Sequence, residues 1–331
     1  MYRNYLVTGA TGFLGRVIVE KLIEQDMQVR VLALQEDLAT AALPHGVEVV
    51  YGDVCDAESL LPFFWGVGAD TCVIHCAGVV SVASNPGKVL YDVNVRGTEN
   101  ILHLCAMYDV GKLVYVSSVH AIPARPKGVV ITERAIFSPD AVRGDYAKSK
   151  TMATEQVFAA ARRGLNASVV FPSGIIGPGS SQNSSIMRML LSFLAGKLPF
   201  AVKGGYDFVD VRDVADGILG CAAHGLPGHG YILSGHFATI RDILTIAKAT
   251  IKQTRMTMYL PIGFARHVAP LYERYCLRRK KPLFFTPYAV EVLDSNGAFS
   301  HQEATKAFGY TPRPICDTLK DTVSWLQRKE T

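Results

Sequence analysis

Short apolar runs alternate with longer stretches of helical periodicity through the first 225 residues of the chain. Six of these runs are nearly continuous in hydrophobic residues, which is typical of strands covered on both faces of a sheet. The predicted strands are residues 5–8, 28–34, 47–51, 71–77, 112–117 and 167–171, with helical patterns at 57–65, 87–107 and 146–163. This repetition predicts an α/β fold with a Rossmann-type, doubly wound parallel sheet.

The pattern changes after Pro178. We expect the following elements there: a polar loop at 179–185, an apolar helix at 186–195, a return to the sheet layer at 208–223, and helices at 239–252 and 317–328. Two domains are therefore predicted. The first is a Rossmann domain of residues 1–178 with the return segment 208–224, and the second is a smaller, mainly helical C-terminal domain of residues 179–207 and 225–331.

Composition places the chain among globular proteins, because 49% of its residues are apolar and 19% are charged. No apolar run is long enough to cross a bilayer, and the first fifteen residues hold a strand and a turn rather than a signal peptide. We therefore expect a cytoplasmic location without a transmembrane segment. The seven cysteines contain no C-x-x-C pair, so we expect buried, reduced thiols and no metal site.

Charge is unevenly distributed along the chain, whose net charge is +5. From Arg241 onward fifteen Lys and Arg residues stand against eight Asp and Glu, so this part carries +7 and the remainder −2. The first half is therefore not a nucleic-acid platform. The basic run at 278–281 is typical of a solvated face. The alternative is contact with an anionic substrate or a membrane surface, with residues 272–281 as the contact helix.

A glycine-rich turn stands where the first predicted strand meets the first predicted helix. Gly9, Gly12 and Gly15 are spaced three apart, and the helical pattern begins at Val17. A dinucleotide pyrophosphate needs unblocked backbone N–H groups and the positive end of a helix dipole. The turn therefore predicts a dinucleotide-binding site, although glycine triplets also occur in ordinary turns.

A second group of residues is suited to proton transfer. Tyr146 and Lys150 are four residues apart and share one face of a predicted helix, where the cation would lower the pKa of the phenol. Ser117 and Ser118 follow the fifth predicted strand at its carboxyl end, the edge at which open parallel sheets bind ligands. Together these residues predict acid–base chemistry on a substrate oxygen.

These motifs resemble those of the extended short-chain dehydrogenases/reductases, also called NAD-dependent epimerase/dehydratases, over nearly the whole chain. Residues 8–15 match the family's TGxxGxxG turn. Tyr146 and Lys150 match its Y-x-x-x-K pair and Ser118 its serine, a position that Ser117 fits less well. Further matches are Asp53, the Cys76-Ala77-Gly78 stretch, Asn94, and residues 208–215 and 308–312.

The resemblance implies a shared mechanism and a homodimer. Tyr146 would be the general acid/base, Lys150 would hold the nicotinamide ribose and depress the pKa of the tyrosine, and Ser118 would hydrogen-bond the substrate oxygen. The implied cofactor-binding residues are Gly9, Thr11, Gly12, Phe13, Leu14, Gly15, Asp53, Val54, Cys76, Ala77, Gly78, Asn94, Tyr146, Lys150, Pro172, Ser173 and Ile175.

Three of the polar candidates have a second interpretation. Asn94 could orient a water beside the lysine or simply break a helical face. Asp53 could contact the adenine side of the cofactor or be an ordinary turn carboxylate. His120, two residues after Ser118, could face the substrate cleft or be a hydrogen-bonded structural histidine.

The second predicted strand bears on the choice between NAD and NADP. Ala33 occupies the position that is usually acidic in NAD-dependent proteins, and Leu34 the position where reductases often carry arginine. Glu36 and Asp37 follow and would repel a 2′-phosphate, and Arg16 is the one basic residue that could approach it. We expect the cofactor to be NAD or NADP, and the two acidic residues favour NAD.

Two positions separate this chain from the sugar-nucleotide enzymes of the family. Gly174 and Tyr206 stand where those enzymes commonly carry Asn and Arg. Pro172-Ser173 instead resembles the Pro-Thr of the dihydroflavonol-4-reductase and 3β-hydroxysteroid dehydrogenase branch, which acts on hydrophobic alcohols and ketones. The apolar helix at 186–195 could line such a site or form only the core of the domain.

We therefore predict an NAD(P)-dependent oxidoreductase that interconverts a secondary alcohol and a ketone on a small, fairly apolar substrate. Two alternatives are a sugar-nucleotide epimerase or dehydratase with tightly held NAD, and a non-catalytic NAD(P)-sensing protein. Loss of Tyr146 or Lys150 would indicate the sensing protein, and both residues are present.

Overall fold

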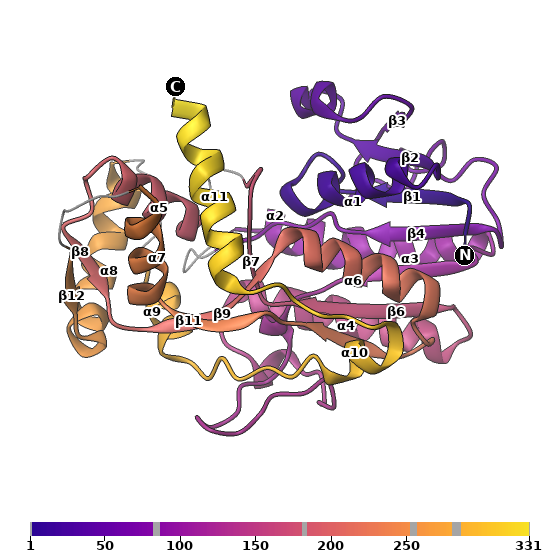
Figure 1. Cartoon of the computed structure of the whole chain (residues 1–331). Coiled ribbons are helices and arrows are strands. Elements are labelled where there is room, and N and C mark those ends of the chain that lie inside the picture. The colour runs from indigo at the N-terminus through magenta and orange to yellow at the C-terminus, as the bar shows by residue number, and fades with distance from the viewer. Residues whose placement is uncertain (1, 82–86, 181–183, 252–256, 280–285, 331) are drawn as a thin grey trace.

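The computed structural model of the chain describes residues 2–81, 87–180, 184–251, 257–279 and 286–330. A seven-stranded parallel sheet lies at its centre, in the order β10-β6-β5-β4-β1-β2-β3 (Figure 1). Its strands are β1 (Asn4–Thr8), β2 (Gln28–Ala33), β3 (Glu48–Tyr51), β4 (Thr71–His75), β5 (Lys112–Val116), β6 (Ala167–Pro172) and β10 (Gly230–Leu233). This topology confirms the predicted Rossmann-type sheet.

All six predicted strands are present, and the seventh, β10, pairs with β6. β10 falls within residues 225–331, which the sequence assigns to the helical domain. The predicted domain boundary therefore differs from the structure at this strand. The strand is only four residues long and begins with a glycine, and so short a run carries little strand signal. Helix α10 (Gln302–Phe308) packs against β10 and α6, and therefore also belongs to the sheet layer.

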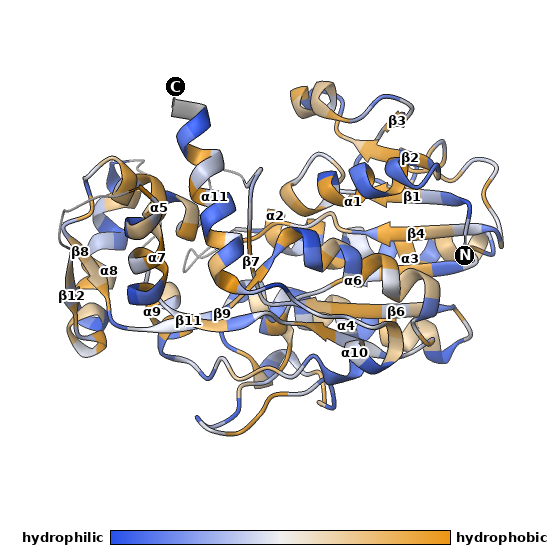
Figure 2. Cartoon of the chain, in the orientation of Figure 1, coloured by the Kyte–Doolittle hydropathy of each residue, from blue (hydrophilic) through white to orange (hydrophobic). Residues whose placement is uncertain are grey.

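Helices cover both faces of this sheet. α1 (Phe13–Glu24) and α6 (Val211–His224) pack together on one face, and α3 (Gly97–Met107) and α4 (Asp145–Arg162) lie on the other. Successive strand residues point to opposite faces, so Leu6 joins one core and Val7 the other. This arrangement explains why the strands are nearly continuous in apolar residues, shown in orange in Figure 2.

Two predicted helices differ from the structure. Residues 57–65 form a succession of turns, because Pro62 has no N–H to donate within a helix and Phe63 and Phe64 are drawn fully into the core. Residues 87–107 are divided into α2 (Val89–Tyr91), a π-helical turn (Asp92–Arg96) and α3. The remaining short helical turns of the described chain are 3₁₀ segments at Leu38–Ala42, Val119–Ala121 and Pro139–Ala141.

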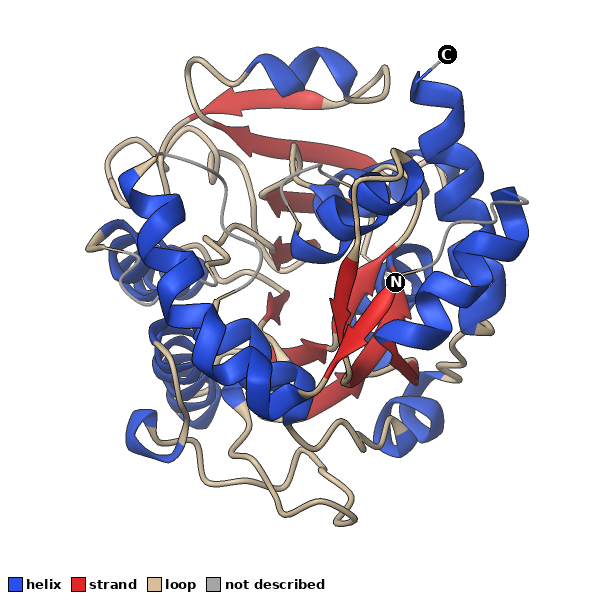
Figure 3. Ribbon diagram, turned by 90° about the vertical axis from the view of Figure 1, so that its left-hand side faces the viewer, coloured by secondary structure: helices blue, strands red, loops and turns tan. Residues whose placement is uncertain are grey.

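A second layer lies beyond the carboxyl ends of the strands. It contains the sheet β11-β9-β7 and the strand pair β12-β8, and Figure 3 shows the molecule from this side. The strands are β7 (Gly174–Ile176), β8 (Phe200–Val202), β9 (Gly205–Asp210), β11 (His236–Thr239) and β12 (Met258–Leu260). The helices are α5 (Ser185–Leu194), α7 (Ile240–Ile251), α8 (Ile262–Arg278), α9 (Pro287–Asp294) and α11 (Ile315–Glu330). The predicted return to the sheet layer at 208–223 is therefore divided between the two layers. β9 joins this small sheet, and only α6 packs on the main sheet.

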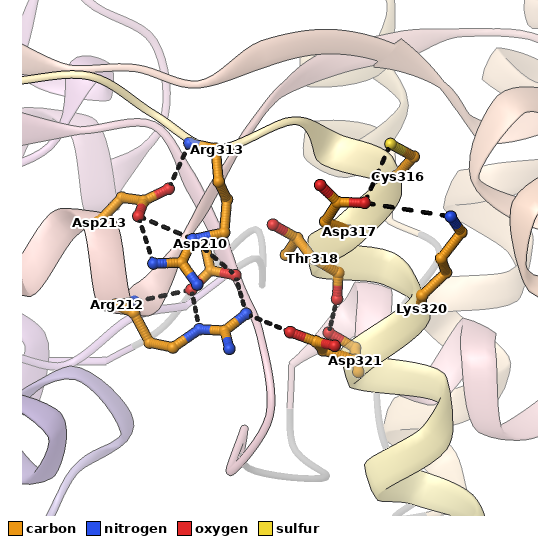
Figure 4. Close-up of polar contacts among 10 residues, drawn as sticks. Asp210, Arg212, Asp213, Arg313, Cys316, Asp317, Thr318, Lys320 and Asp321 are labelled. Carbon is orange, nitrogen blue, oxygen red and sulfur yellow. Dashed lines mark hydrogen bonds and ion pairs between the residues drawn. The ribbon is translucent and has the colours of Figure 1, made fainter.

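Ion pairs fasten the C-terminal segment to the start of α6 (Figure 4). Arg313 bonds Asp213 through its backbone N at 2.7 Å and its Nε at 2.8 Å. Arg212 bonds the N-cap residue Asp210 at 2.7 Å and reaches Asp321 of α11 at 2.8 Å. Asp210 and Asp213, both at the start of the helix, are buried. The pair of Arg212 with Asp321 joins this cluster to α11.

Two further kinds of feature are absent from the described residues. No helix in this part of the chain is long and apolar enough to cross a membrane. No group of three or more His, Cys, Asp or Glu residues in the same described ranges could hold a metal ion.

Candidate active site

The glycine turn joins β1 to α1 as a close-packed backbone cradle. Gly9 has a φ of +71°, and a Cβ there would lie 2.7 Å from the backbone N of Ala77. A Cβ on Gly15 would lie 2.1 Å from the carbonyl oxygen of Gly9. Gly12 is the N-cap of α1 and supplies no capping side chain, so the first amides of the helix are open to a ligand. The turn fits a pyrophosphate at the positive end of α1, with the other predicted contacts, Thr11, Phe13 and Leu14, in the same turn.

A buried polar chain holds the ends of β1 and β4 together beside this cradle. Thr8 Oγ1 lies 2.7 Å from His75 Nδ1 and accepts the N–H of Ala77 at 3.2 Å. His75 Nε2 lies 3.1 Å from Thr98 Oγ1. Burial lowers the pKa of His75 to about 3, and the positive charge of Lys150 adds to that effect. His75 therefore stays neutral and bridges the two threonines.

Ser118, Tyr146 and Lys150 come together where β5 ends and α4 begins. Tyr146 lies in the first turn of α4, and Ser118 lies near enough to its phenol to lower the pKa of that group. Lys150 is one turn further along the same helix and is buried. Ser117 points elsewhere, since its Oγ lies 2.7 Å from Thr154 Oγ1. The geometry thus groups the three predicted catalytic residues and separates Ser117 from them.

The lysine ammonium faces β5 and not the phenol. Its Nζ donates to the carbonyl oxygen of Val116 at 2.9 Å and to the hydroxyl of Tyr115 at 3.4 Å. Burial lowers the pKa of Lys150 to about 8 and raises the pKa of Tyr146 to about 12. The expectation that the lysine depresses the tyrosine pKa is therefore wrong for this arrangement, because burial dominates and the opposing effect comes from Ser118.

Gly78, Asn94 and Lys150 meet beside the cradle. A Cβ on Gly78 would lie 3.2 Å from Asn94 Oδ1 and 3.3 Å from Lys150 Nζ. Asn94 is buried, and its amide is bonded to the backbone of Val79 at 2.8 and 3.0 Å and to Ser149 Oγ at 3.0 Å. Asn94 therefore fastens the loop after β4 to α4, and it does so from the π-helical turn that interrupts the predicted helix.

The remaining predicted cofactor contacts lie around the carboxyl edge of the main sheet. Asp53 is exposed, and its Oδ1 accepts the N–H of Cys55 at 2.8 Å, which is the geometry of a turn carboxylate. The others lie at the carboxyl edge of the main sheet or directly beyond it, and their contact with the cofactor stays a prediction: Val54, Cys76, Ala77, Pro172, Ser173 and Ile175. The pKa of the Cys76 thiol is raised to about 12 by burial, so this side chain is neutral.

The end of β2 offers no free cation for a 2′-phosphate. β2 ends at Ala33, and Leu34 is 56% exposed. Asp37 caps the turn that follows by accepting the N–H of Ala39 at 3.0 Å. Arg16 already pairs with Glu20 at 2.8 Å. These contacts agree with the expectation of NAD.

An apolar cavity of about 560 Å³ lies within the second layer, and one of its lining residues, His120, contacts Tyr146. Its apolar lining includes Ile186 and Met189 of α5, two of the residues predicted to line a substrate cleft. Three polar side chains lie at the end nearest Tyr146: His120, Tyr206 of β9 and Tyr288 of α9. A smaller cavity of about 250 Å³ is lined by Tyr146 and shares Tyr288.

His120 connects these aromatic residues. The hydroxyl of Tyr206 lies 3.2 Å from its Nε2, and that of Tyr288 lies 3.1 Å from its Nδ1. The ring meets the edge of Tyr146 with centroids 5.8 Å apart. Burial lowers the pKa of His120 to about 4, so the imidazole is neutral. Both interpretations of His120 therefore apply: it is hydrogen-bonded, and it faces the cavity.

Sequence reasoning missed Tyr288 and the glycine that admits it. Gly144 has a φ of +86°, and a Cβ there would lie 2.7 Å from Tyr288 Cε2, so the ring packs directly over the start of α4. Tyr288 is 168 residues from His120 in the chain, and its surrounding sequence carries no motif. Tyr206 was marked only as a departure from the arginine of the sugar-nucleotide enzymes.

The fold and this site define a Rossmann-type, dinucleotide-dependent enzyme. The model of the NAD dependent epimerase/dehydratase family matches residues 5–233, and the chain belongs to that family. The predicted resemblance to the extended short-chain dehydrogenases/reductases is thereby confirmed, as is an NAD-dependent enzyme.

Several relatives match almost the whole chain. It is 29% identical over 328 residues to "sterol demethylase protein B" of Methylococcus capsulatus, covering 98% of both chains. It is 28% identical to a "putative dihydroflavonol 4-reductase" of Synechocystis sp., covering 98% of this chain and 94% of that one. The crystal structure of gox2253 has a TM-score of 0.85 and 28% identity, covering 99% of this chain and 98% of its own. UDP-glucose 4-epimerase of Thermotoga maritima, at 19% identity and a TM-score of 0.81, shares the fold, covering 99% of this chain and all of its own.

Proposed function

We propose that the protein interconverts a secondary alcohol and a ketone on a small, apolar substrate, with Tyr146 as the general acid/base. The observation that carries this proposal is the apolar cavity whose polar end, His120, Tyr206 and Tyr288, adjoins Tyr146. A substrate with an apolar body and one reacting oxygen matches a cavity with a mainly apolar lining and three polar aromatic residues near Tyr146.

The residues of the cradle and of α4 would hold the cofactor. Gly9, Gly12 and Gly15 would receive the pyrophosphate, and Lys150 would bind the nicotinamide ribose. When bound, NAD(P) supplies or accepts the hydride. Lys150 lies close enough to Gly78 to reach a group that enters along the loop after β4.

Tyr146 is protonated at neutral pH, as any tyrosine with the ordinary pKa of 10 would be, and burial raises its pKa further, to about 12. In the direction of reduction it would donate this proton to the substrate oxygen as that oxygen gains electron density. Ser118, which lowers the pKa of the phenol, would orient the same oxygen and stabilise the phenolate that remains. The charged form of Lys150 would assist electrostatically.

Two observations favour this substrate class over a nucleotide sugar. Lys197 is the one cation among the described residues that line the cavity, which is few for a diphosphate. Relatives with 28 to 29% identity include proteins named for a sterol and a dihydroflavonol, and the 19% identical epimerase supports the fold alone.

We also infer a homodimer, which sedimentation of the purified chain would test.

The test is a screen of 3-oxosteroids, dihydroflavonols and UDP-4-keto sugars as substrates. The absorbance of added NADH measures turnover of each. The proposal predicts that NADH is consumed with an apolar ketone and that Tyr146→Phe abolishes the reaction while NADH still binds. Conversion of a nucleotide sugar with NAD that never exchanges would support the epimerase alternative. NADH binding without any turnover would support a sensing protein.

A further inference from the structure

Helix α8 presents a row of apolar side chains to solvent. Phe264, Leu271 and Tyr275 are 54%, 65% and 49% exposed, and half-buried Val268 lies between them. Their spacing of four, three and four residues places them on one side of the helix, and we call this set the apolar stripe. The helix packs on the protein through a different side, which carries Ala265, Ala269 and Cys276.

Cations border the apolar stripe. Arg274 and Arg278 are exposed, and the same rotation of the helix places them along one edge of the stripe. Glu273 is the one acidic residue in α8, all of which is described, and it is buried. The outer face of the helix therefore combines apolar and basic side chains without an exposed carboxylate. Two further cations of the predicted basic run, Lys280 and Lys281, lie outside the described residues.

The apolar stripe and the apolar cavity lie on two sides of the same helix. Tyr272, on α8, lines the cavity, as does Phe200 of β8, which is 51% exposed. α8, β8 and β12 lie together at the end of the molecule farthest from the N-terminus (Figure 1). An apolar substrate taken from a lipid phase would thus meet the protein at the end where its cavity lies.

We propose that α8 docks this end of the protein on an anionic lipid surface, with the apolar stripe at the acyl boundary and the bordering cations on the headgroups. Charge favours this occupant over a second copy of the chain, because the bordering cations match anionic headgroups and would meet no exposed carboxylate on the α8 of a second copy. An apolar stripe edged by Arg is the pattern that anionic lipid recognises. The docking surface does not depend on the proposed function.

Co-sedimentation of the full chain with vesicles tests the proposal. We expect binding to mixed phosphatidylcholine and phosphatidylglycerol vesicles, and on the order of tenfold weaker binding to phosphatidylcholine alone or at high salt. The double variant Arg274→Gln/Arg278→Gln should lose on the order of tenfold in affinity for the anionic vesicles. Phe264→Ser/Leu271→Ser should bind more weakly at every salt concentration. These four positions are outside the cavity lining, so NADH binding should be unchanged.

Matched substitutions elsewhere serve as controls. Leu38→Ser removes an apolar side chain that is 90% exposed, and Arg125→Gln removes an exposed cation, so both should bind vesicles like the unmodified chain. Failure of the unmodified chain to bind anionic vesicles would overturn the proposal, as would unchanged binding by both α8 variants. A dimer that the stripe substitutions dissociate, without vesicle binding, would assign the surface to a second copy.

Discussion

The cofactor half and the substrate half of the site are built on different principles. Around the glycine turn the backbone leaves no room for a side chain, since a Cβ on Gly9 or Gly15 would meet other backbone atoms. Around the cavity, the shape comes from side chains of distant segments, with His120, Tyr206 and Tyr288 drawn from three elements. We therefore expect cofactor binding to depend on the main chain and substrate selection on side chains, so that substitutions can separate the two.

Tyr146→Phe, at the junction of the two halves, should have the largest effect. Loss of the proton donor should lower kcat by a factor of about 10² to 10⁴, while the Kd for NADH stays within a few-fold. Steady-state kinetics and fluorescence titration would measure the two quantities. Tyr275→Phe, an exposed tyrosine on α8 outside the cavity lining, is the matched control and should retain full activity.

Gly15→Ala should break the cofactor half alone. The new Cβ would lie 2.1 Å from the carbonyl oxygen of Gly9, so the turn must open and the Kd for NADH should rise by on the order of 100-fold, about 2.7 kcal/mol. Isothermal titration would measure this change. Gly263→Ala, where a Cβ meets nothing within 4 Å, should leave the Kd unchanged; a similar loss there would refute the steric argument.

The pH profile should separate the cation of the cofactor half from the imidazole of the substrate half. Burial lowers the pKa of Lys150 from 10.5 to about 8, so the ammonium is charged below pH 8 and lost above it. Ketone reduction should therefore decline as the pH rises through about 8. His120, with a pKa lowered to about 4, should add no inflection between pH 5 and 7.

Lys150→Arg checks the assignment of that decline. A guanidinium stays charged throughout this range, so any residual activity of the variant should not decline near pH 8. A profile of kcat/KM that keeps the same limb in the variant would show that another group titrates.

Tyr288→Phe should have the smallest effect and should act on the substrate half alone. It removes the hydroxyl that lies 3.1 Å from His120 Nδ1 and leaves the ring packed on Gly144. We expect KM for the ketone to rise by roughly 5- to 30-fold, the cost of one buried hydrogen bond, with kcat and NADH binding nearly unchanged. A fall in kcat as large as that of Tyr146→Phe would place Tyr288 in proton transfer instead.

The difference between the halves also explains what the sequence could predict. The glycine turn and the Tyr146–Lys150 pair are local patterns whose meaning depends on residues a few positions apart, and the strands around them follow from continuous apolar runs. β10 is too short to stand out in the sequence. Residues 57–65 have a helical pattern of apolar positions, but Pro62 cannot donate the hydrogen bond that a helix needs. Tyr288 joins the site only because α9 folds back over the start of α4, which no local pattern encodes.

The direction of the tyrosine pKa required the structure for a similar reason. A spacing of four residues places Tyr146 and Lys150 on one helical face, but it does not say where the ammonium points. In the folded chain it turns to Val116 and Tyr115 of β5, and burial of the phenol becomes the dominant effect on its pKa.

The most direct test of the proposed function is single-turnover mixing of the enzyme and excess NADH with an apolar ketone, beside the corresponding UDP-4-keto sugar. Stopped-flow absorbance would follow the nicotinamide, with Tyr146→Phe as the comparison. We predict oxidation of free NADH with the apolar ketone, dependent on Tyr146, and none with the nucleotide sugar. Oxidation with the nucleotide sugar alone, or a rate unchanged by Tyr146→Phe, would contradict the account.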